Sequence, residues 1–268
     1  MRYFDAHCHI QFDKYADDRD AIITRMREEG IGGLVVGVDK ESSESALDLV
    51  HDSETLWATA GHHPNDTPLE QFDEAATRAL LASPKVVAVG ECGIDYFRPE
   101  DANAEVKRSQ RELFERHIGL SVEYGKPLMI HGRPSKGSMD AYHDLLSILE
   151  SGKQEHGDKL RGNVHFFVGD TDIARRVFAL DFTVSYTAVL TFARDYDEAV
   201  RFAPLDRLLT ETDAPYVAPK SRRGQRNDPL SIPEIVTALA EIRGEDRETV
   251  REAVLRNAIR AFKVETAS

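Results

Sequence analysis

Histidines and carboxylates of the kind that bind divalent metal ions recur along the chain, each close to the end of a short apolar segment. They are His7, His9, Glu91, His131, His165 and Asp213. Imidazole favours borderline ions such as Zn²⁺, Mn²⁺, Fe²⁺ and Co²⁺, while Mg²⁺ could still occupy such a site with several waters. These six ligands are too many for one open catalytic ion, but they suffice for two ions that share a carboxylate and a water. The set therefore predicts a two-metal hydrolytic centre, and we assign Glu91 as the bridging carboxylate.

The spacing of the first two histidines favours a shared ligand role. His7 and His9 stand two residues apart, and on an extended strand this spacing points both rings to one side while Cys8 faces the other. Two imidazoles that face one way need a shared cation or several hydrogen-bond acceptors. Isolated histidines in helical or loop segments are more often structural, and we interpret four of them in this way: His51, His117, His143 and His156.

Short β-rich segments alternate with longer segments of helical periodicity, and these elements must position the candidate ligands. The expected strands are residues 2–5, 33–38, 56–60, 86–90, 127–130, 163–166, 182–185 and 208–210. The expected helices are residues 17–29, 42–53, 69–82, 105–124, 139–150, 172–179, 197–202, 233–242 and 245–262. Alternation of strand and helix eight times is what a (β/α)₈ TIM barrel requires, here as a single domain over residues 1–268.

The candidate ligands all fall at the carboxyl ends of the expected strands. In a barrel these ends converge on one face, so residues far apart in the sequence can come within coordination distance. A doubly wound sheet would fit the alternation almost as well, but it usually carries a glycine-rich loop after its first strand, where this chain has Ala-His-Cys-His. We therefore expect a TIM barrel with a metal centre at its C-terminal face.

Composition restricts the classes of function. The 268 residues are 41% hydrophobic and 30% charged, as in ordinary globular proteins, and no apolar segment is long enough to cross a membrane. The first residues lack the features of a signal peptide and the chain has only two cysteines, so we expect a cytoplasmic protein. The net charge of -13 disfavours extended binding of duplex nucleic acid, and it allows a polyanionic substrate only where cations are concentrated.

Seven short blocks occur in order within residues 5–229: DAHCHI, GHHPN, GECGIDY, MIHGRPS, VHFFVG, TETDAPY and RRGQRNDP. As an ordered set they resemble the signature blocks of the TatD-type DNases, metal-dependent hydrolases related to the amidohydrolase and phosphotriesterase group. The resemblance implies a TIM barrel with a divalent metal centre. It also implies hydrolysis of DNA, typically as an exonuclease or an unspecific DNase.

Carried over by motif position, the resemblance implies two ligand sets that share one glutamate. The first is His7, His9, Glu91 and Asp213, and the second is Glu91, His131 and His165. His63 matches the family's histidine before proline, whose implied role is phosphate contact or catalysis. A water that bridges two Mg, Mn, Zn or Co ions would be an activated nucleophile at neutral pH. Asp213 could orient or deprotonate that water, while His63 could donate a hydrogen bond to the phosphate or to the leaving oxygen.

Two blocks depart from the usual family sequence without removing a ligand. GECGIDY has Cys92 where the family more often has an aliphatic residue, and HGRP replaces a more usual His-Ser-Arg. Gly132 and Pro134 could therefore reshape the rim beside His131. Glu91 also argues against the amidohydrolases that bridge their metals with a carboxylated lysine, because no lysine occupies this position.

Basic residues near the expected site are candidates for binding phosphate. A long irregular stretch, residues 214–232, contains four cations with no acidic residue between them: Lys220, Arg222, Arg223 and Arg226. Arg222 and Arg223 could guide a nucleic-acid end into the metal site, or this loop could be a solvated surface loop or a structural clamp onto neighbouring helix ends. Arg133 is another candidate for phosphate contact. Asp95 could hold a metal ligand from behind, or it could lie in a solvated loop.

The leading hypothesis is a metal-dependent phosphodiesterase that acts on DNA. A confined metal pocket on an acidic protein admits a single-stranded end more readily than a duplex, which favours exonuclease action. The same centre could instead hydrolyse small esters, amides, lactones or phosphoesters if its rim differed. A metal-containing binding protein without turnover is a third hypothesis, which missing ligands would favour, but no ligand is missing from the motifs. We expect a monomer that does not associate with membranes.

Overall fold

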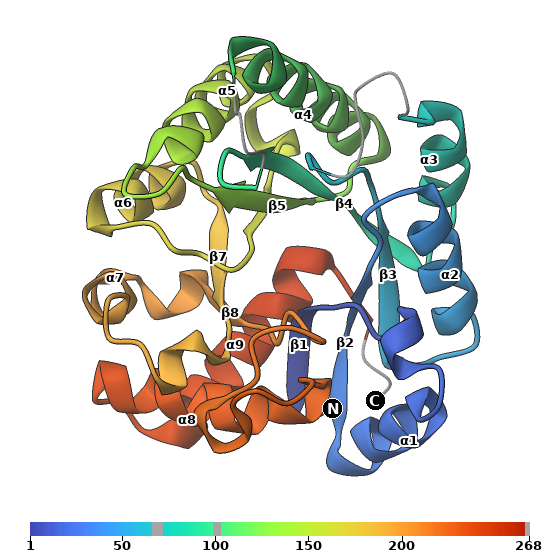
Figure 1. Ribbon diagram of the computed structural model, residues 1–268, viewed down its shortest axis with the longest axis vertical. Coiled ribbons are helices and arrows are strands. Elements are labelled where there is room, and N and C mark those ends of the chain that lie inside the picture. The colour runs from blue at the N-terminus through green and yellow to red at the C-terminus, as the bar shows by residue number, and fades with distance from the viewer. Residues whose placement is uncertain (66–71, 99–102, 266–268) are drawn as a thin grey trace.

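The structure of the protein is a computed structural model that describes residues 1–65, 72–98 and 103–265. In this part of the chain, eight parallel strands form the centre of the molecule (Figure 1). They are β1 (Tyr3–Cys8), β2 (Ile31–Val36), β3 (Leu56–Ala60), β4 (Val86–Asp95), β5 (Leu128–Arg133), β6 (Gly162–Val164), β7 (Thr183–Tyr186) and β8 (Leu208–Thr210). Each strand is hydrogen-bonded to the next one along the chain, from β1 to β8.

Helices form a ring outside the strands (Figure 1). Among the described residues they are α1 (Arg19–Glu29), α2 (Lys40–Val50), α3 (Glu74–Leu81), α4 (Ala104–Tyr124), α5 (Asp140–His156), α6 (Thr171–Ala179), α7 (Asp197–Phe202), α8 (Ile232–Arg243) and α9 (Arg247–Phe262). Several begin at a side-chain cap: Asp39 accepts a hydrogen bond from the Ser42 N–H, for example. None of the described helices combines the length and the apolarity that crossing a bilayer requires. The order of elements confirms the predicted (β/α)₈ barrel.

Hydrogen bonds between the first and last strands bring the two ends of the sheet together. The backbone N–H of Asp213 donates to the His7 carbonyl at 2.9 Å. The buried carboxylate of Asp5 accepts hydrogen bonds from the N–H and the hydroxyl of Thr212, at 2.9 and 2.6 Å. Because these contacts join β1 to the segment after β8, they place the candidate ligands at the start of the chain beside Asp213.

The strands are buried on both faces, as is usual for a parallel sheet that helices cover. Every residue of β1, β2 and β3 is buried. Near the amino-terminal ends of the strands, the ring of Phe4 stacks with those of Trp57 and Phe262, at centroid distances of 6.0 and 6.3 Å. These aromatic residues close that end of the barrel, and the polar side chains of the candidate site gather at the opposite end.

Some elements differ from the expected bounds. β4 continues to Asp95 instead of ending at residue 90. Gly93 permits this extension, because it has φ 138° and a Cβ at its position would lie 2.1 Å from the carbonyl oxygen of His131. The close approach places Gly93 opposite His131 on the adjacent strand β5, and Glu91 lies two residues before Gly93 on β4. α5 continues past residue 150, and the first residues of the expected helix 69–82, residues 69–71, lie outside the described part of the chain.

Candidate metal centre

The candidate ligands come together at the carboxyl ends of the strands, as the barrel geometry predicts. They lie on, or directly follow, β1, β4, β5, β6 and β8. All of them are buried except His131, which is partly buried. Their nitrogen and oxygen atoms form groups of three in which all ligand atoms lie within 4.8 Å of one another. The fold thus unites metal-binding groups from both ends of the chain.

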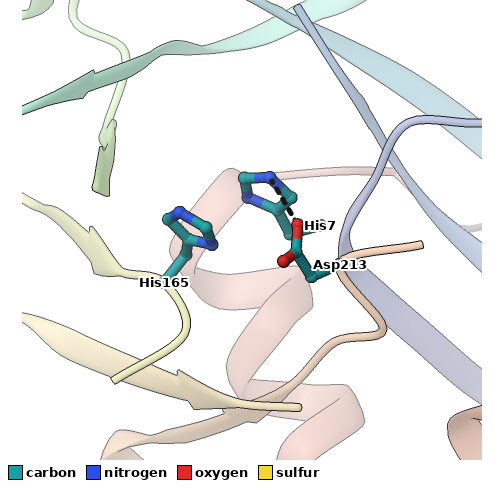
Figure 2. Close-up of side chains that lie close together, drawn as sticks. All are labelled: His7, His165 and Asp213. Carbon is teal, nitrogen blue, oxygen red and sulfur yellow. Dashed lines mark ion pairs between the residues drawn. The ribbon is translucent and has the colours of Figure 1, made fainter. Parts of the chain in front are cut away.

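One group of ligand atoms surrounds the histidines of the first strand. The Nε2 atoms of His7 and His9 lie 3.1 Å apart. His7 Nε2 is 3.3 Å from Glu91 Oε2 and 3.9 Å from Asp213 Oδ1, and Figure 2 shows the latter contact. His9 Nε2 is 3.6 Å from the same Asp213 oxygen. Figure 2 also shows the His165 ring facing the site beside His7, with 3.9 Å between the ring centroids. The imidazoles of His7, His9 and His165 and two carboxylates therefore converge on one small volume.

A second group of ligand atoms lies on the other side of Glu91. Glu91 Oε1 is 2.9 Å from His131 Nδ1 and 2.9 Å from His165 Nε2. These two histidine nitrogens are 3.3 Å apart. The two carboxylate oxygens of Glu91 thus face different groups, since Oε2 faces His7 while Oε1 faces His131 and His165. This is the arrangement that a carboxylate shared by two cations requires.

The chemistry of these groups fits divalent cations. Burial alone would raise the pKa of the Glu91 carboxyl, but electrostatic interactions with the surrounding imidazoles, that of His165 above all, hold it well below its usual range. Burial also opposes ionisation of Asp213, yet its interactions with the nearby imidazoles of His9 and His7 lower the pKa of that carboxyl. Both carboxylates are therefore ionised at neutral pH, beside imidazole nitrogens that point at one another. A borderline divalent ion satisfies such a set of imidazole and carboxylate donors.

Hydrogen-bonding groups hold several of these histidines from behind. His9 Nδ1 donates to a backbone carbonyl of β2 at 2.8 Å. His131 Nε2 lies 3.0 Å from Asp95 Oδ2, and His165 Nδ1 lies 3.3 Å from Glu211 Oε1. The hydrogen bonds of His9 and His131 are of the kind that sets the tautomer and the orientation of a metal-binding histidine and leaves its other nitrogen for the metal, whereas Glu211 lies within ion-pair distance of His165. Both histidines of the second group are thus backed by carboxylates.

The two backing carboxylates are themselves held in place. Asp95 is fully buried, so the alternative of a solvated loop carboxylate is wrong. Its Oδ1 accepts hydrogen bonds from the N–H groups of Phe97 and Arg98, at 2.8 and 3.0 Å. Glu211 is also fully buried, and its Oε2 accepts a hydrogen bond from the Ser185 hydroxyl at 2.5 Å. Glu211 lies in the TETDAPY block, but neither its residue type nor its position in the sequence marks it as a site residue.

His63 lies beside the second group of ligands, whereas its neighbour His62 does not. His63 Nε2 is 3.4 Å from Glu91 Oε1, and its Nδ1 accepts a hydrogen bond from the Asn65 N–H at 3.2 Å. Because Nδ1 accepts, the neutral ring carries its proton on Nε2, which faces the centre. Burial lowers the pKa of His63 to about 3, so the ring is neutral near pH 7. His62 packs against Phe72 instead, with 5.6 Å between the ring centroids.

A cleft of about 1430 Å³ opens above the candidate ligands. Phe97 and Arg98, which follow β4, lie along one part of its rim, together with Arg133 and Lys136 from the end of β5 and the loop beyond it. Within the described ranges, the side-chain cations of Arg98, Arg133 and Lys136 have no ion-pair or hydrogen-bond partner. Positive charge is therefore available beside the centre in a chain whose net charge is -13.

The arginines in the loop after β8 are placed differently from Arg133. Arg222 forms an ion pair with Asp228 at 2.8 Å and donates a hydrogen bond to the Ser231 hydroxyl. Arg223 lies over the ring of Phe192, 3.9 Å from its centroid. Neither arginine is among the described residues that line the cleft. For Arg222 and Arg223 the structure favours the role of a clamp between neighbouring segments over contact with a substrate.

Comparison with known proteins extends over nearly the whole chain. Residues 4–263 match the family described as TatD related DNase. The uncharacterized metal-dependent hydrolase YabD of Bacillus subtilis is 32% identical over 265 residues, which cover 97% of this chain and 99% of YabD. The 3'-5' ssDNA/RNA exonuclease TatD of Cronobacter sakazakii is 33% identical over 269 residues, which cover 97% of this chain and 97% of that protein.

A solved structure shows the same similarity in three dimensions. The TatD homologue YjjV of Escherichia coli K12 superposes on this chain with a TM-score of 0.85 at 26% sequence identity. The superposition covers 98% of this chain and 99% of YjjV. Similarity of sequence and similarity of fold therefore extend over the same full-length barrel.

Proposed function

The chain belongs to the TatD related DNase family and is a metal-dependent hydrolase, and from this premise we propose that it hydrolyses phosphodiester bonds at the ends of single-stranded DNA. The observation that carries the proposal is the position of Glu91, whose two oxygens face two separate groups of imidazole nitrogens at the base of a cleft. A relative named as a 3'-5' ssDNA/RNA exonuclease supports a single-stranded nucleic acid as substrate.

In this proposal the chain would hold two divalent cations. His7, His9, Glu91 and Asp213 would hold one of them, and Glu91, His131 and His165 would hold the other. When bound, the ions supply an activated water and offset the negative charge that builds on the phosphate during hydrolysis. Mg²⁺, Mn²⁺, Zn²⁺ and Co²⁺ are the candidate ions, and the number of imidazoles favours the borderline ones.

The chain's own residues orient the reactants. Asp213 is ionised, and its Oδ1 is directed toward His7 and His9, so it can orient a water in the centre and accept its proton. His63 carries its proton on Nε2 and can donate a hydrogen bond to a phosphate oxygen or to the leaving oxygen. Arg133 can bind a phosphate of the strand through its planar guanidinium.

The charge distribution favours the end of a single strand as the substrate. Most of the protein's surface repels polyanions, because acidic residues exceed basic residues by 47 to 34. Three cations that have no ion-pair or hydrogen-bond partner in the described structure lie at the cleft, on the loop after β4 and at the end of β5 and the loop beyond it: Arg98, Arg133 and Lys136. A flexible strand can enter such a confined cleft, whereas a duplex needs a broad basic face.

Degradation of end-labelled single-stranded DNA tests the proposal. The protein is stripped of metal and supplied separately with Mg²⁺, Mn²⁺, Co²⁺ or Zn²⁺, and DNA labelled at either end reports where shortening begins. We expect metal-dependent shortening by the wild type and none by Glu91→Ala. Glu123→Ala is the matched control, since that glutamate lies on α4 and pairs with Arg78 at the surface.

Two outcomes would overturn the proposal. If DNA stays intact with every metal while a small ester or phosphodiester is hydrolysed, the metal centre is active but its substrate is not DNA. If Glu91→Ala degrades DNA as fast as the wild type, hydrolysis does not depend on the shared carboxylate.

A further inference from the structure

Exposed aromatic side chains mark the cleft above the metal centre. Among the described residues three large hydrophobic side chains are strongly exposed: Phe97 at 48%, Tyr216 at 42% and Phe202 at 39%. Phe97 and Tyr216 line the cleft, whereas Phe202 ends α7 and does not. An apolar ring that faces water gains free energy when a ligand covers it. The packing of the fold does not account for the exposed ring of Phe97. Such a ring suits a substrate that has an apolar face.

The position of Phe97 is tied directly to the metal centre. Its N–H donates a hydrogen bond to Asp95 Oδ1 at 2.8 Å, and the other oxygen of the same carboxylate lies 3.0 Å from His131 Nε2. Asp95 also pairs in register with Arg133 on the neighbouring strand β5. One buried carboxylate thus holds both a candidate metal ligand and the rim residue, so the ring stands at a defined place next to the reacting centre.

A cation accompanies the ring. The guanidinium carbon of Arg133 lies 4.1 Å from the centroid of Phe97, within the range of a cation–π contact. Apart from this contact, the guanidinium has no hydrogen-bond or ion-pair partner in the described part of the chain. Its N–H groups can therefore bind phosphate oxygens while its plane supports the phenyl ring. An aromatic face beside a free guanidinium offers a nucleotide contacts for both its base and its phosphate.

We propose that Phe97 is a stacking platform for the nucleobase next to the phosphodiester bond that is cleaved, with Arg133 bound to an adjacent phosphate. This inference rests on the proposed function and deepens it, because it names how the site selects its substrate. A base can lie on the ring only after it has left the stack of its neighbours, and every base has a π face. The platform therefore selects single strands over duplexes and does not select a sequence.

Cleavage of single-stranded oligonucleotides by variants of the metal-loaded enzyme tests the platform. In Phe97→Ala we expect kcat/KM to fall about 5- to 150-fold, the range for loss of one stacked base. We expect Phe97→Trp to keep most of the activity that Phe97→Ala loses, because the indole ring can also stack on a base. The matched control is Phe202→Ala: Phe202 is also exposed and also carries a guanidinium over its ring, that of Arg175 at 5.0 Å, but it lies outside the cleft. Its removal leaves kcat/KM unchanged.

Substrates with one abasic nucleotide identify the base that meets the ring. The abasic position is moved one nucleotide at a time along the strand and tested with both the wild type and Phe97→Ala. If Phe97 stacks on one base, removal of that base should lower kcat/KM of the wild type by about the same factor as Phe97→Ala lowers it on intact DNA. Removal of the same base should lower kcat/KM of Phe97→Ala little further. The inference is overturned if, at every abasic position, the loss from the missing base and the loss from Phe97→Ala multiply. Such independent effects would show that Phe97 and a base are not in contact.

The outcomes separate this inference from the proposed function. If the wild type cleaves no oligonucleotide with any metal, the proposed function has failed and the platform with it. If the wild type cleaves single strands and Phe97→Ala cleaves them equally well, the platform alone is refuted. Metal content and unfolding temperature of each variant are measured alongside, and a loss of activity that Phe97→Trp does not restore also counts against stacking.

Discussion

Replacement of Asp95 by Asn is expected to weaken one metal position and to leave the other intact. Asp95 Oδ1 accepts hydrogen bonds from the N–H groups of Phe97 and Arg98, while Oδ2 faces the Nε2 of His131 at 3.0 Å. An asparagine has a single acceptor oxygen. If that oxygen stays with the two N–H groups, the amide NH₂ opposes the Nε2–H of the histidine. If the amide flips, the two backbone donors lose their acceptor, so one hydrogen bond is lost in the first orientation and two in the second.

The size of the effect follows from the burial of this carboxylate. Loss of a group that holds a metal-binding histidine usually lowers metal affinity about 10- to 100-fold, which corresponds to about 1.4 to 2.7 kcal/mol. Asp95 is fully buried, so water cannot take its place, and we expect the upper part of this range. The effect is confined to the position that uses His131, because the rings of His7 and His9 lie against other groups.

Competition with a metal-binding dye measures the affinity directly and does not depend on catalysis. Metal-stripped protein is titrated with Mn²⁺ or Zn²⁺, and we expect two binding steps for the wild type, of which one is weakened in Asp95→Asn. Asp144→Asn is the control. Its carboxylate accepts a hydrogen bond from Tyr96 at 2.6 Å and so lies on the same side of the barrel. Its hydrogen bonds in the described structure are with Tyr96 and Arg111, and neither is a candidate ligand.

Two results would refute this reasoning. If Asp95→Asn binds the metal as tightly as the wild type in both steps and unfolds at the same temperature, the carboxylate does not hold His131 for the metal. Equal weakening of both steps would show that His131 does not belong to one metal position only.

Two further predictions concern stability. His117 is fully buried, and burial lowers its pKa to about 4 from the ordinary value of 6.5. Because the pKa is lower in the folded state than in the unfolded state, the neutral ring's contribution to the free energy of folding is complete above pH 6.5. That contribution declines by up to about 3 kcal/mol as the pH falls toward 4. Urea unfolding at pH 7.5 and 4.5 should show a smaller acid loss in His117→Asn than in the wild type, and equal losses would contradict the assignment. Arg222→Ala removes the contacts with Asp228 and Ser231. Because this ion pair is partly exposed, we expect the free energy of unfolding to fall by about 1 kcal/mol. The unfolding temperature should therefore fall while KM for DNA stays unchanged. A raised KM with unchanged unfolding temperature would instead restore the substrate-contact role.

Local features of the sequence predicted the barrel and the gathering of the candidate ligands. Strand and helix alternate, and the ligands follow the strands, so the common direction of parallel strands was enough to predict that His7 and Asp213 meet. The spacing of His7 and His9 required no further information, because every second residue of a strand faces the same way. The extension of β4 was missed, since the pattern of apolar residues ends before the polar residues that continue the strand.

The choice between His63 and His62 came from family resemblance, because the two histidines are adjacent and of one type. The structure supplies the physical difference. His63 Nε2 reaches Glu91 at 3.4 Å, whereas the ring of His62 packs against Phe72. Neighbouring residues at the end of a strand point in different directions, and only the packing around them determines which one faces the cleft.

The sequence by itself determined the strand order and the common face of the candidate ligands, because these depend on residue type and on position along each strand. Only the tertiary structure decided which other polar groups lie beside the candidate ligands. Glu211 does not differ in type from many surface residues, yet it is buried behind His165. Arg133 was a candidate from its position two residues after His131, but its place over Phe97 at the cleft came from the structure. Arg222, in a more basic segment, is bound to Asp228 instead. Such pairings depend on contacts between distant segments, and these contacts exist only once the barrel has closed.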